Sequence, residues 1–188
     1  MMRIIELFEE KKEERIPHLY LDMDGVQADF FGEWAKMHGV SSYKDIPDAE
    51  RSIVDLANSG PEKVYNFFAD LKPLPGGQKI IKWLHDNKIP FTVLSAPLRG
   101  SYQEYSILGK QDWLNMHNPG ASEKAIFTSL KYKYALDKDG NPNVLVDDHG
   151  KYLDAWREHG GIAVKHKDSN TDHTIRQLEQ IYSKFLDK

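Results

Sequence analysis

Acidic residues follow two short apolar segments of this 188-residue sequence. The first segment ends in Asp22-Met-Asp24-Gly25, and a later one ends in Asp147-Asp148. Carboxylates that lose water at the ends of buried strands repel one another, so a cation or hydrogen bonds must compensate. Mg²⁺ prefers oxygen ligands and keeps several waters, so a few carboxylates and one substrate oxygen would complete its shell. These residues therefore predict a magnesium site suited to phosphoryl transfer.

Hydroxyl and ammonium groups suited to binding a phosphate follow two further apolar segments. One segment ends in Ser95, and the sequence Thr128-Ser-Leu-Lys131 follows the other. Each polar residue has a structural alternative, because an aspartate can cap a helix, a serine can form a turn and a lysine can be solvated at the surface. Their occurrence in this order on successive predicted strands favours a shared phosphate and metal site.

Buried parallel strands are expected to position these polar residues. Short β-rich segments without polar alternation predict five strands, at His18–Asp22, Phe91–Ser95, Ala125–Thr128, Val144–Asp147 and Ile162–Lys165. Segments with helical spacing of apolar residues lie between most of them, at Gln78–Asn87, Ser106–His117 and Lys151–His159. This alternation predicts an α/β fold with a doubly wound parallel sheet, in which ligands bind beyond the carboxyl ends of the strands.

The segment 29–74 interrupts the alternation. No strand is expected there, and helices are expected around Phe30–His38, Asp48–Asn58 and Pro61–Leu71. We therefore predict a core domain formed by residues 18–28 and 75–188, with a small helical cap at residues 29–74 inserted after the first strand. Residues 1–17 are expected to add a charged N-terminal helix with a narrow apolar edge.

Composition limits the expected partners. The sequence carries a formal net charge of −4 and no cysteine, which excludes disulfides, thiolate metal sites and cysteine nucleophiles. The negative balance argues against stable nucleic-acid binding and favours a small anionic ligand in a locally positive pocket. No apolar run approaches the roughly 20 residues that cross a bilayer, so a cytoplasmic protein without membrane contact is expected. A homodimer is compatible with the sequence.

Two other groups of potential metal ligands are expected to be structural. The segment from Asp137 to Asn143 begins like a calcium loop but lacks the glutamate that closes an EF-hand, which favours an ordinary turn. The spacing of four histidines in the second half of the sequence matches no zinc pattern. These residues are His149, His159, His166 and His173.

The segment LYLDMDGVQADFF resembles the first signature of haloacid-dehalogenase-type phosphatases, in which Asp-x-Asp-Gly follows an apolar strand. Ser95, Lys131 and the pair Asp147-Asp148 occupy the places of the second, third and fourth motifs. These matches cover the sequence from about His18 to Lys165. The resemblance implies a magnesium-dependent phosphatase.

A closer likeness is to the 5'(3')-deoxyribonucleotidases. The sequence shares LDMDGV-x-ADF with them and then has NFF-x-x-L-x-PLPG, here from Asn66 to Gly76. Lys110 and Trp113 occupy the places of a lysine and a tryptophan that follow the second motif. This likeness implies hydrolysis of a small phosphate monoester, namely a deoxyribonucleoside monophosphate.

The resemblance also implies a role for each motif residue. Asp22 would attack phosphorus and become phosphorylated transiently, while Asp24 would act first as general acid and then as general base. The implied magnesium ligands are Asp22, Asp24, Asp147 and Asp148. Asp147 is favoured over Asp148 as a direct ligand. The implied phosphate-binding residues are Ser95, Ala96, Lys110 and Lys131.

Aromatic side chains near the first motif and in the cap bind the base in these nucleotidases. Phe30 has the matching place after the first motif, and Phe67 and Phe68 are candidates from the cap. Stacking would accept any base because every base has a π face. The alternative is that these side chains pack the core of the cap itself.

Three positions depart from the nucleotidase pattern. Ala96 replaces a second hydroxyl residue, Ser129 stands where an arginine often precedes the lysine, and His149 replaces an arginine after the two acids. These changes leave the hydrolytic residues in place but leave the substrate open. The alternatives are a phosphatase for another small ester or a polynucleotide-end phosphate, and a non-catalytic nucleotide-binding module.

Overall fold

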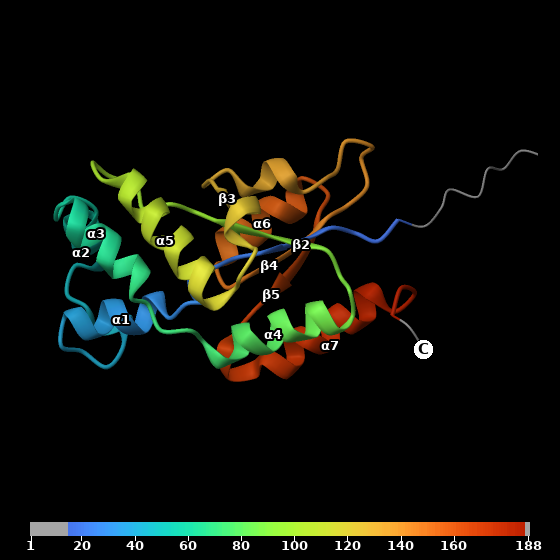
Figure 1. Ribbon diagram of the computed structural model, residues 1–188, viewed down its shortest axis with the longest axis horizontal. Helices are drawn as coiled ribbons and strands as arrows, with labels where there is room; N and C mark the ends of the chain where they lie inside the picture. Colours follow the sequence, from blue (N-terminus) through green and yellow to red (C-terminus); the bar gives the residue numbers. More distant parts are fainter. Residues whose placement is uncertain (1–14, 187–188) are drawn as a thin grey trace, which may run out of the picture.

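Five parallel strands form a sheet that helices cover on both faces (Figure 1). A computed structural model describes residues 15–186. The strand order is β3-β2-β1-β4-β5, and all four neighbouring pairs are parallel. The bounds are β1 Leu19–Leu21, β2 Phe91–Ser95, β3 Ile126–Phe127, β4 Val144–Asp147 and β5 Ile162–Lys165. The predicted α/β fold and its five strands are confirmed, with β1 and β3 shorter than expected.

The central position of β1 brings its carboxyl end next to that of β4. Leu21 pairs with Val93 of β2 on one side and with Val146 of β4 on the other. The backbone N–H of Asp22 donates to the Val146 carbonyl oxygen at 3.0 Å, which extends the β1–β4 ladder to the first residue after the strand. Parallel strands end at the same edge of a sheet, so β1 and β4 bring Asp22 and Asp147 to one place.

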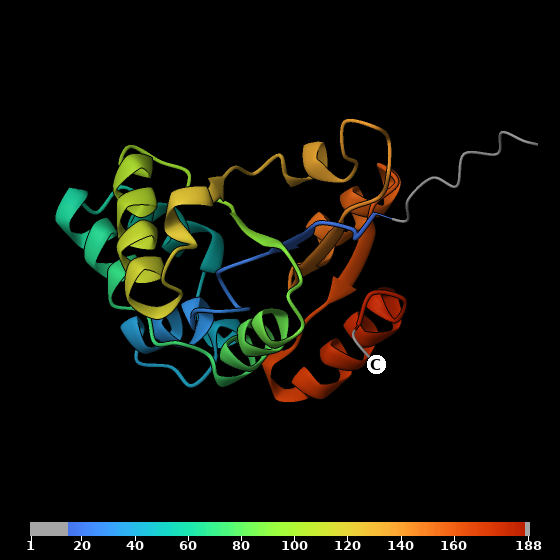
Figure 2. The same cartoon turned by 45° about the vertical axis from the view of Figure 1, so that its right-hand side comes forward.

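Two of the helices that cover one face of the sheet pack against each other. Helix α4 (Pro75–Asp86) and helix α7 (Thr171–Tyr182) lie side by side in both views (Figures 1 and 2). A proline suits the first turn of α4, because its φ is already helical and its missing N–H would have no partner there. The buried side chains of Leu84 and Leu178 pack in one cluster with Leu19.

Helices α6 and α5 cover different faces: α6 lies opposite to α4 and α7, whereas α5 lies on their side, because its contact Val93 pairs with Leu21 and so points to the same face. Helix α6 (Gly150–Glu158) buries Trp156 in a cluster with Leu145 of β4, and helix α5 (Gln103–His117) buries Trp113 in a cluster with Val93 of β2. Each indole N–H donates to a main-chain carbonyl oxygen, so these large side chains leave no unsatisfied polar group in the core. The α5 cluster also extends to the segment after β1.

Helices alone fill the segment between β1 and α4. They are α1 (Phe30–Met37), the 3-10 helix η1 (Tyr43–Asp45), α2 (Ala49–Ala57) and α3 (Pro61–Ala69). Asp29 and Asp48 cap α1 and α2, because each carboxylate accepts a hydrogen bond from a backbone N–H of the first turn. The structure has no strand within residues 29–74, as predicted. Whether this segment acts as a separate cap stays a prediction.

Several elements were not expected from the sequence. Helix α7 was not predicted, and neither were four short 3-10 helices, η1, η2 (Ser122–Lys124), η3 (Lys131–Tyr134) and η4 (Asp168–Asn170). The predicted N-terminal helix lies almost entirely outside the described residues. Among residues 15–186, no helix is long and apolar enough to cross a bilayer.

The acidic turn before β4 is held by its own hydrogen bonds. The Asp137 carboxylate accepts from the backbone N–H groups of Asp139 and Asn141 and from the Asn141 side-chain amide, and it also pairs with Arg15. These contacts engage both carboxylate oxygens. They favour the ordinary turn over a calcium loop.

Candidate active site

Lys131 joins the carboxyl ends of β1 and β4. Its Nζ lies 2.8 Å from Asp22 Oδ1 and 2.6 Å from Asp147 Oδ2, and the side chain is 1% exposed. Burial alone would lower the pKa of this ammonium group, but the neighbouring carboxylates of Asp22 and Asp147 raise it above its usual value. Lys131 therefore stays charged and holds the two acids together.

Three carboxylates converge beside this ammonium group. Asp22, Asp147 and Asp148 each present an oxygen atom within 4.8 Å of the other two. Burial, and then the negative charge of Asp22, raise the pKa of Asp147 to about 7 and that of Asp148 to about 8. A divalent cation would relieve this repulsion, and an all-oxygen set suits Mg²⁺. The residues therefore fit the metal that the sequence implies.

Gly25 allows this close grouping. Its φ is +74°, in the left-handed region that glycine adopts readily. A Cβ atom at this position would lie 2.6 Å from Asp148 Oδ2, which is too close for a real contact. Any other residue at position 25 would therefore displace Asp148 from Asp22.

A second ammonium group holds Asp24. Lys110 Nζ lies 2.7 Å from Asp24 Oδ2, and it also donates to Ser95 Oγ at 2.9 Å and to the Ala96 carbonyl oxygen at 2.6 Å. The lysine comes from α5 and is fully buried. Burial, followed by the charge of Asp22, raises the pKa of Asp24 against the opposing effects of both lysines. The second oxygen, Oδ1, is buried and accepts no hydrogen bond.

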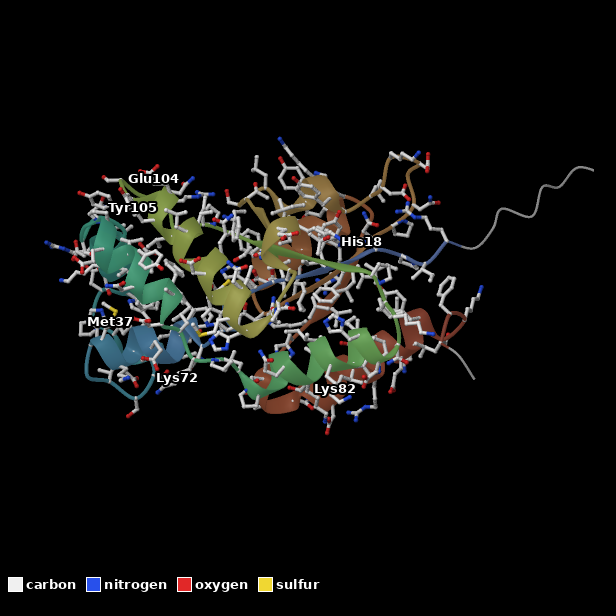
Figure 3. All side chains as sticks on the ribbon, in the orientation of Figure 1. His18, Met37, Lys72, Lys82, Glu104 and Tyr105 are labelled. Carbon is white, nitrogen blue, oxygen red and sulfur yellow. The ribbon has the colours of Figure 1, made fainter. Side chains whose placement is uncertain are left out.

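The predicted aromatic residues lie in the segment between β1 and α4, mostly inside its core. Phe68 is 1% exposed and stacks on Phe30 at 6.0 Å between ring centroids. Phe67 is partly buried and lines a surface cavity of about 590 Å³ between α1, α2 and α3. Met37, at the molecular surface, also lines this cavity (Figure 3). The burial of Phe30 and Phe68 supports the core-packing alternative for these two residues.

Two aromatic residues near the acids were not identified from the sequence as site residues. Phe31 approaches Gly25 so closely that a Cβ atom there would lie 2.9 Å from the Phe31 ring. The ring of Tyr152 lies 4.5 Å from Lys131 Nζ, in cation–π contact. Tyr152 lies in the first turn of α6, and no local spacing in the sequence indicates its contact with Lys131.

Most of the described chain matches one protein family. The family model for "5' nucleotidase, deoxy (Pyrimidine), cytosolic type C protein" matches residues 15–181. The matched range includes every residue that the sequence assigned to the site. Comparison with curated proteins finds no match.

Solved structures that match this chain include several hydrolases. One is a haloacid-dehalogenase family hydrolase from Deinococcus radiodurans R1 with bound phosphate and sodium, which is 13% identical. The match covers 92% of this chain and 99% of that chain, with a TM-score of 0.48. A hydrolase from Pseudomonas syringae is 12% identical, with coverage of 87% and 98% and a TM-score of 0.47. A haloacid-dehalogenase hydrolase of family IA, variant 3, from Entamoeba histolytica is 15% identical, with coverage of 87% and 88% and a TM-score of 0.45.

Proposed function

Because the chain belongs to the family of cytosolic type C deoxy (pyrimidine) 5' nucleotidases, we propose that it hydrolyses deoxyribonucleoside monophosphates at the site around Asp22. It is a haloacid-dehalogenase-type phosphatase that acts on phosphomonoesters. The nucleotide substrate, the mechanism and the magnesium requirement are parts of the proposal. The family description also supports the expected cytoplasmic location.

The different surroundings of two aspartates in the first motif carry the proposal. Asp22 contacts the charged amine of Lys131 and lies beside the acids of β4, while Asp24 contacts Lys110 and has a raised pKa. The raised pKa suits Asp24 to hold a proton, as a general acid must. The amine of Lys131 holds the Asp22 carboxyl group in place as the nucleophile.

In the first step, a carboxylate oxygen of Asp22 forms a bond to phosphorus as the bond between phosphorus and the leaving alkoxide breaks. Asp24 gives its proton to that alkoxide, so a neutral nucleoside leaves. Lys131 stabilises the negative charge that the phosphoryl oxygens and Asp22 share, and the Ser95 hydroxyl adds a hydrogen-bond donor. An aspartyl phosphate on Asp22 results.

In the second step, Asp24 now lacks its proton and acts as a base. It takes a proton from a water molecule whose oxygen attacks phosphorus, and the bond between phosphorus and the Asp22 oxygen breaks. Inorganic phosphate and the original carboxylate are released. Lys110 holds Asp24 Oδ2 during both steps, which leaves Oδ1 for proton transfer.

Asp22, Asp148, Asp147 and the main-chain carbonyl of Asp24 would hold Mg²⁺, which when bound neutralises charge on the phosphoryl oxygens. Asp147 already accepts hydrogen bonds at both oxygens, from Lys131 and from the backbone N–H of His149 at 2.7 Å. Asp148 accepts no hydrogen bond from any described residue. This difference favours Asp148 as the direct ligand, in place of the Asp147 that the sequence favoured.

The test is phosphate release from a panel of substrates. The panel holds 5'- and 3'-monophosphates of deoxyribo- and ribonucleosides, sugar phosphates and an oligonucleotide with a terminal phosphate. Each is assayed with Mg²⁺ and with EDTA, using wild-type protein and Asp22→Asn. We expect deoxynucleotides to be hydrolysed fastest, only with Mg²⁺, and Asp22→Asn to be inactive.

Other outcomes separate the remaining alternatives. Preference for a sugar phosphate or for the oligonucleotide end would keep the mechanism and overturn the nucleotide assignment. Full activity of Asp22→Asn would overturn the assignment of the nucleophile. A wild-type protein that binds nucleotides by calorimetry yet releases no phosphate from any substrate would be a binding module.

A further inference from the structure

Gln27 is a buried polar residue that the proposed mechanism does not use. Its side chain is fully buried, five residues after the proposed nucleophile. Its Nε2 donates to the main-chain carbonyl oxygen of Asp22 at 2.8 Å. Its Oε1 accepts from Asn118 Nδ2 at 3.0 Å, and Asn118 is itself only 2% exposed. Both ends of the amide are therefore satisfied inside the protein.

The chemistry of the partners determines the orientation of the Gln27 amide. A main-chain carbonyl can only accept a hydrogen bond, so the NH₂ group of Gln27 must face Asp22. The oxygen of Gln27 then faces Asn118, which must present its own NH₂ group. A reversed Gln27 amide would place two oxygens against each other in a buried site, at a large cost.

Asn118 is held in turn by the end of α5. It is the C-terminal cap of this helix, and its backbone N–H donates to the Leu114 carbonyl oxygen at 2.8 Å. The same helix carries Lys110, the partner of Asp24. The Gln27–Asn118 pair therefore links the nucleophile's main chain to the element that holds the proposed general acid.

The main chain of Gln27 is held as firmly as its side chain. Its N–H donates to the Met23 carbonyl oxygen at 2.8 Å, and its carbonyl oxygen accepts from Leu74 N–H at 2.8 Å, at the start of α4. Gly77 of α4 packs so closely on residues 26 and 27 that a Cβ atom there would overlap main-chain atoms. Gln27 is thus a rigid support for the peptide group that follows Asp22.

The hydrogen bond from the Gln27 side chain to the Asp22 carbonyl oxygen affects the orientation of Asp22. The Asp22 N–H completes the ladder with β4, whereas its carbonyl group has left the sheet and is held by Gln27. Rotation of that peptide group would turn the Cα–Cβ bond and move the carboxylate away from Lys131. We propose that Gln27, anchored by Asn118, is a positioning residue that aims the Asp22 carboxylate at the phosphorus. The inference rests on the proposed role of Asp22 as nucleophile.

The test compares kcat and KM of four variants with those of wild-type protein. Gln27→Met and Asn118→Leu remove one partner each with little change in volume, and the double variant removes both. Asn143→Leu is the matched control, because Asn143 is also a buried amide, bonded to the Tyr134 carbonyl oxygen, at the opposite end of β4. Thermal unfolding of each variant establishes that the assay measures folded protein.

We expect Gln27→Met to lower kcat by about tenfold to a hundredfold with KM changed by less than about twofold, because small misplacements of a reacting group are costly. Asn118→Leu should lower kcat in the same direction, and the double variant should be no worse than Gln27→Met. Asn143→Leu should unfold at a lower temperature yet keep wild-type kcat. Asn118→Leu alone tests the inference should Gln27→Met not fold.

Two results would overturn the positioning role. One is wild-type kcat in folded Gln27→Met, or in folded Asn118→Leu should Gln27→Met not fold. The other is a fall in kcat of Asn143→Leu as large as that of Gln27→Met. That result would show that the loss of any buried hydrogen bond lowers kcat. The activity of Asp22→Asn distinguishes failure of this inference from failure of the proposed function. If Asp22→Asn is inactive while Gln27→Met is fully active, only the role of Gln27 is overturned.

Discussion

Two lysines distinguish two aspartates that are only two residues apart in the sequence. Lys131 lies between Asp22 and Asp147, whereas Lys110 is bonded to Asp24, Ser95 and the Ala96 carbonyl oxygen. Both amines are almost completely buried, so each carboxylate interacts with a charge that solvent does not screen. The assignment of a nucleophile and a proton donor follows from these separate contacts.

Asp24→Asn tests the proton donor through the leaving group. An amide cannot protonate an alkoxide, so hydrolysis of a nucleoside monophosphate should slow by about a hundredfold to ten-thousandfold. The first step with p-nitrophenyl phosphate should be much less affected, because p-nitrophenolate leaves without a proton. The measurement is the pre-steady-state burst of product for both substrates. Equal slowing of the two bursts would argue against Asp24 as the acid.

At the scale of elements, close packing between helices brings Lys110 to the site. Helix α5 packs along α3, and Gly109 stands where the two helices approach most closely, since a Cβ atom there would overlap the Tyr65 carbonyl oxygen. The residue next to Gly109 is Lys110. The position of its amine therefore depends on the contact between α5 and α3, which lies in the segment between β1 and α4.

Gly109→Val should destabilise the protein by about 1–3 kcal/mol, because overpacking forces neighbouring backbone to move. Gly150→Ala is the matched control: nothing lies within 4 Å of a Cβ atom at the first residue of α6. This change should be neutral or stabilise by up to about 1 kcal/mol, because it reduces the freedom of the unfolded chain. Urea unfolding at equilibrium measures both. Equal stability of the two variants would contradict the close α3–α5 contact.

The start of β1 has a titratable contact far from the acids. His18 Nε2 bonds Thr92 Oγ1 of β2 at 2.8 Å, and burial, together with the charge of Arg15, lowers the pKa of His18 (Figure 3). The unfolded state thus binds a proton more readily than the folded state. This contribution to stability is complete above the unfolded pKa of about 6.5 and is lost as the pH falls below it.

His18→Gln keeps a hydrogen-bonding group near Thr92 but does not titrate in this range. Lowering the pH from 7 to 5 should therefore reduce the free energy of unfolding of wild-type protein relative to that of the variant. Urea unfolding at half-unit pH steps gives the slope of the free energy of unfolding against pH for both proteins. Identical slopes would show that His18 does not contribute to the pH dependence of folding.

At the scale of the whole molecule, the repelling carboxylates should make stability depend on pH and on Mg²⁺. The folded-state pKa of Asp148 is raised to about 8. Between the unfolded pKa of about 4 and this value, the folded state therefore binds more protons than the unfolded state. In EDTA the stability should therefore fall as the pH rises from about 4 to about 8. At a concentration of about 100 times its Kd, Mg²⁺ should restore about 2.7 kcal/mol, which is roughly 5–10 °C in Tm.

Asp148→Asn should change how stability depends on pH and on Mg²⁺. In EDTA at pH 8 the variant should be more stable than wild-type protein, because one repelling charge is gone. It should also gain little from Mg²⁺ and lose phosphatase activity. Thermal unfolding with EDTA and with Mg²⁺ measures both effects. A Tm increase with Mg²⁺ as large as that of wild-type protein would place the cation elsewhere.

Local patterns in the sequence determined the order and type of most elements. Strands buried on both faces appear as uninterrupted apolar runs, so the five strands, and with them the parallel sheet, could be predicted without coordinates. The same pattern placed Asp22, Asp147 and Asp148 at one edge, because parallel strands end together. Helix α7 was not predicted, although its buried residues Thr171, Thr174, Leu178 and Tyr182 recur at helical spacing.

Only the tertiary structure decided which groups touch. Lys110 and Asp24 are 86 residues apart, and Gln27 and Asn118 are 91 residues apart, so no local spacing indicates either contact. Packing also decided that Phe68 lies inside the core and that the oxygens of Asp147 are occupied by other donors. The sequence by itself determined the fold and the acids of the site, because these depend on the period of apolar residues along the chain. The division of roles among those acids depends on burial and on distant charges, which exist only once the chain has folded.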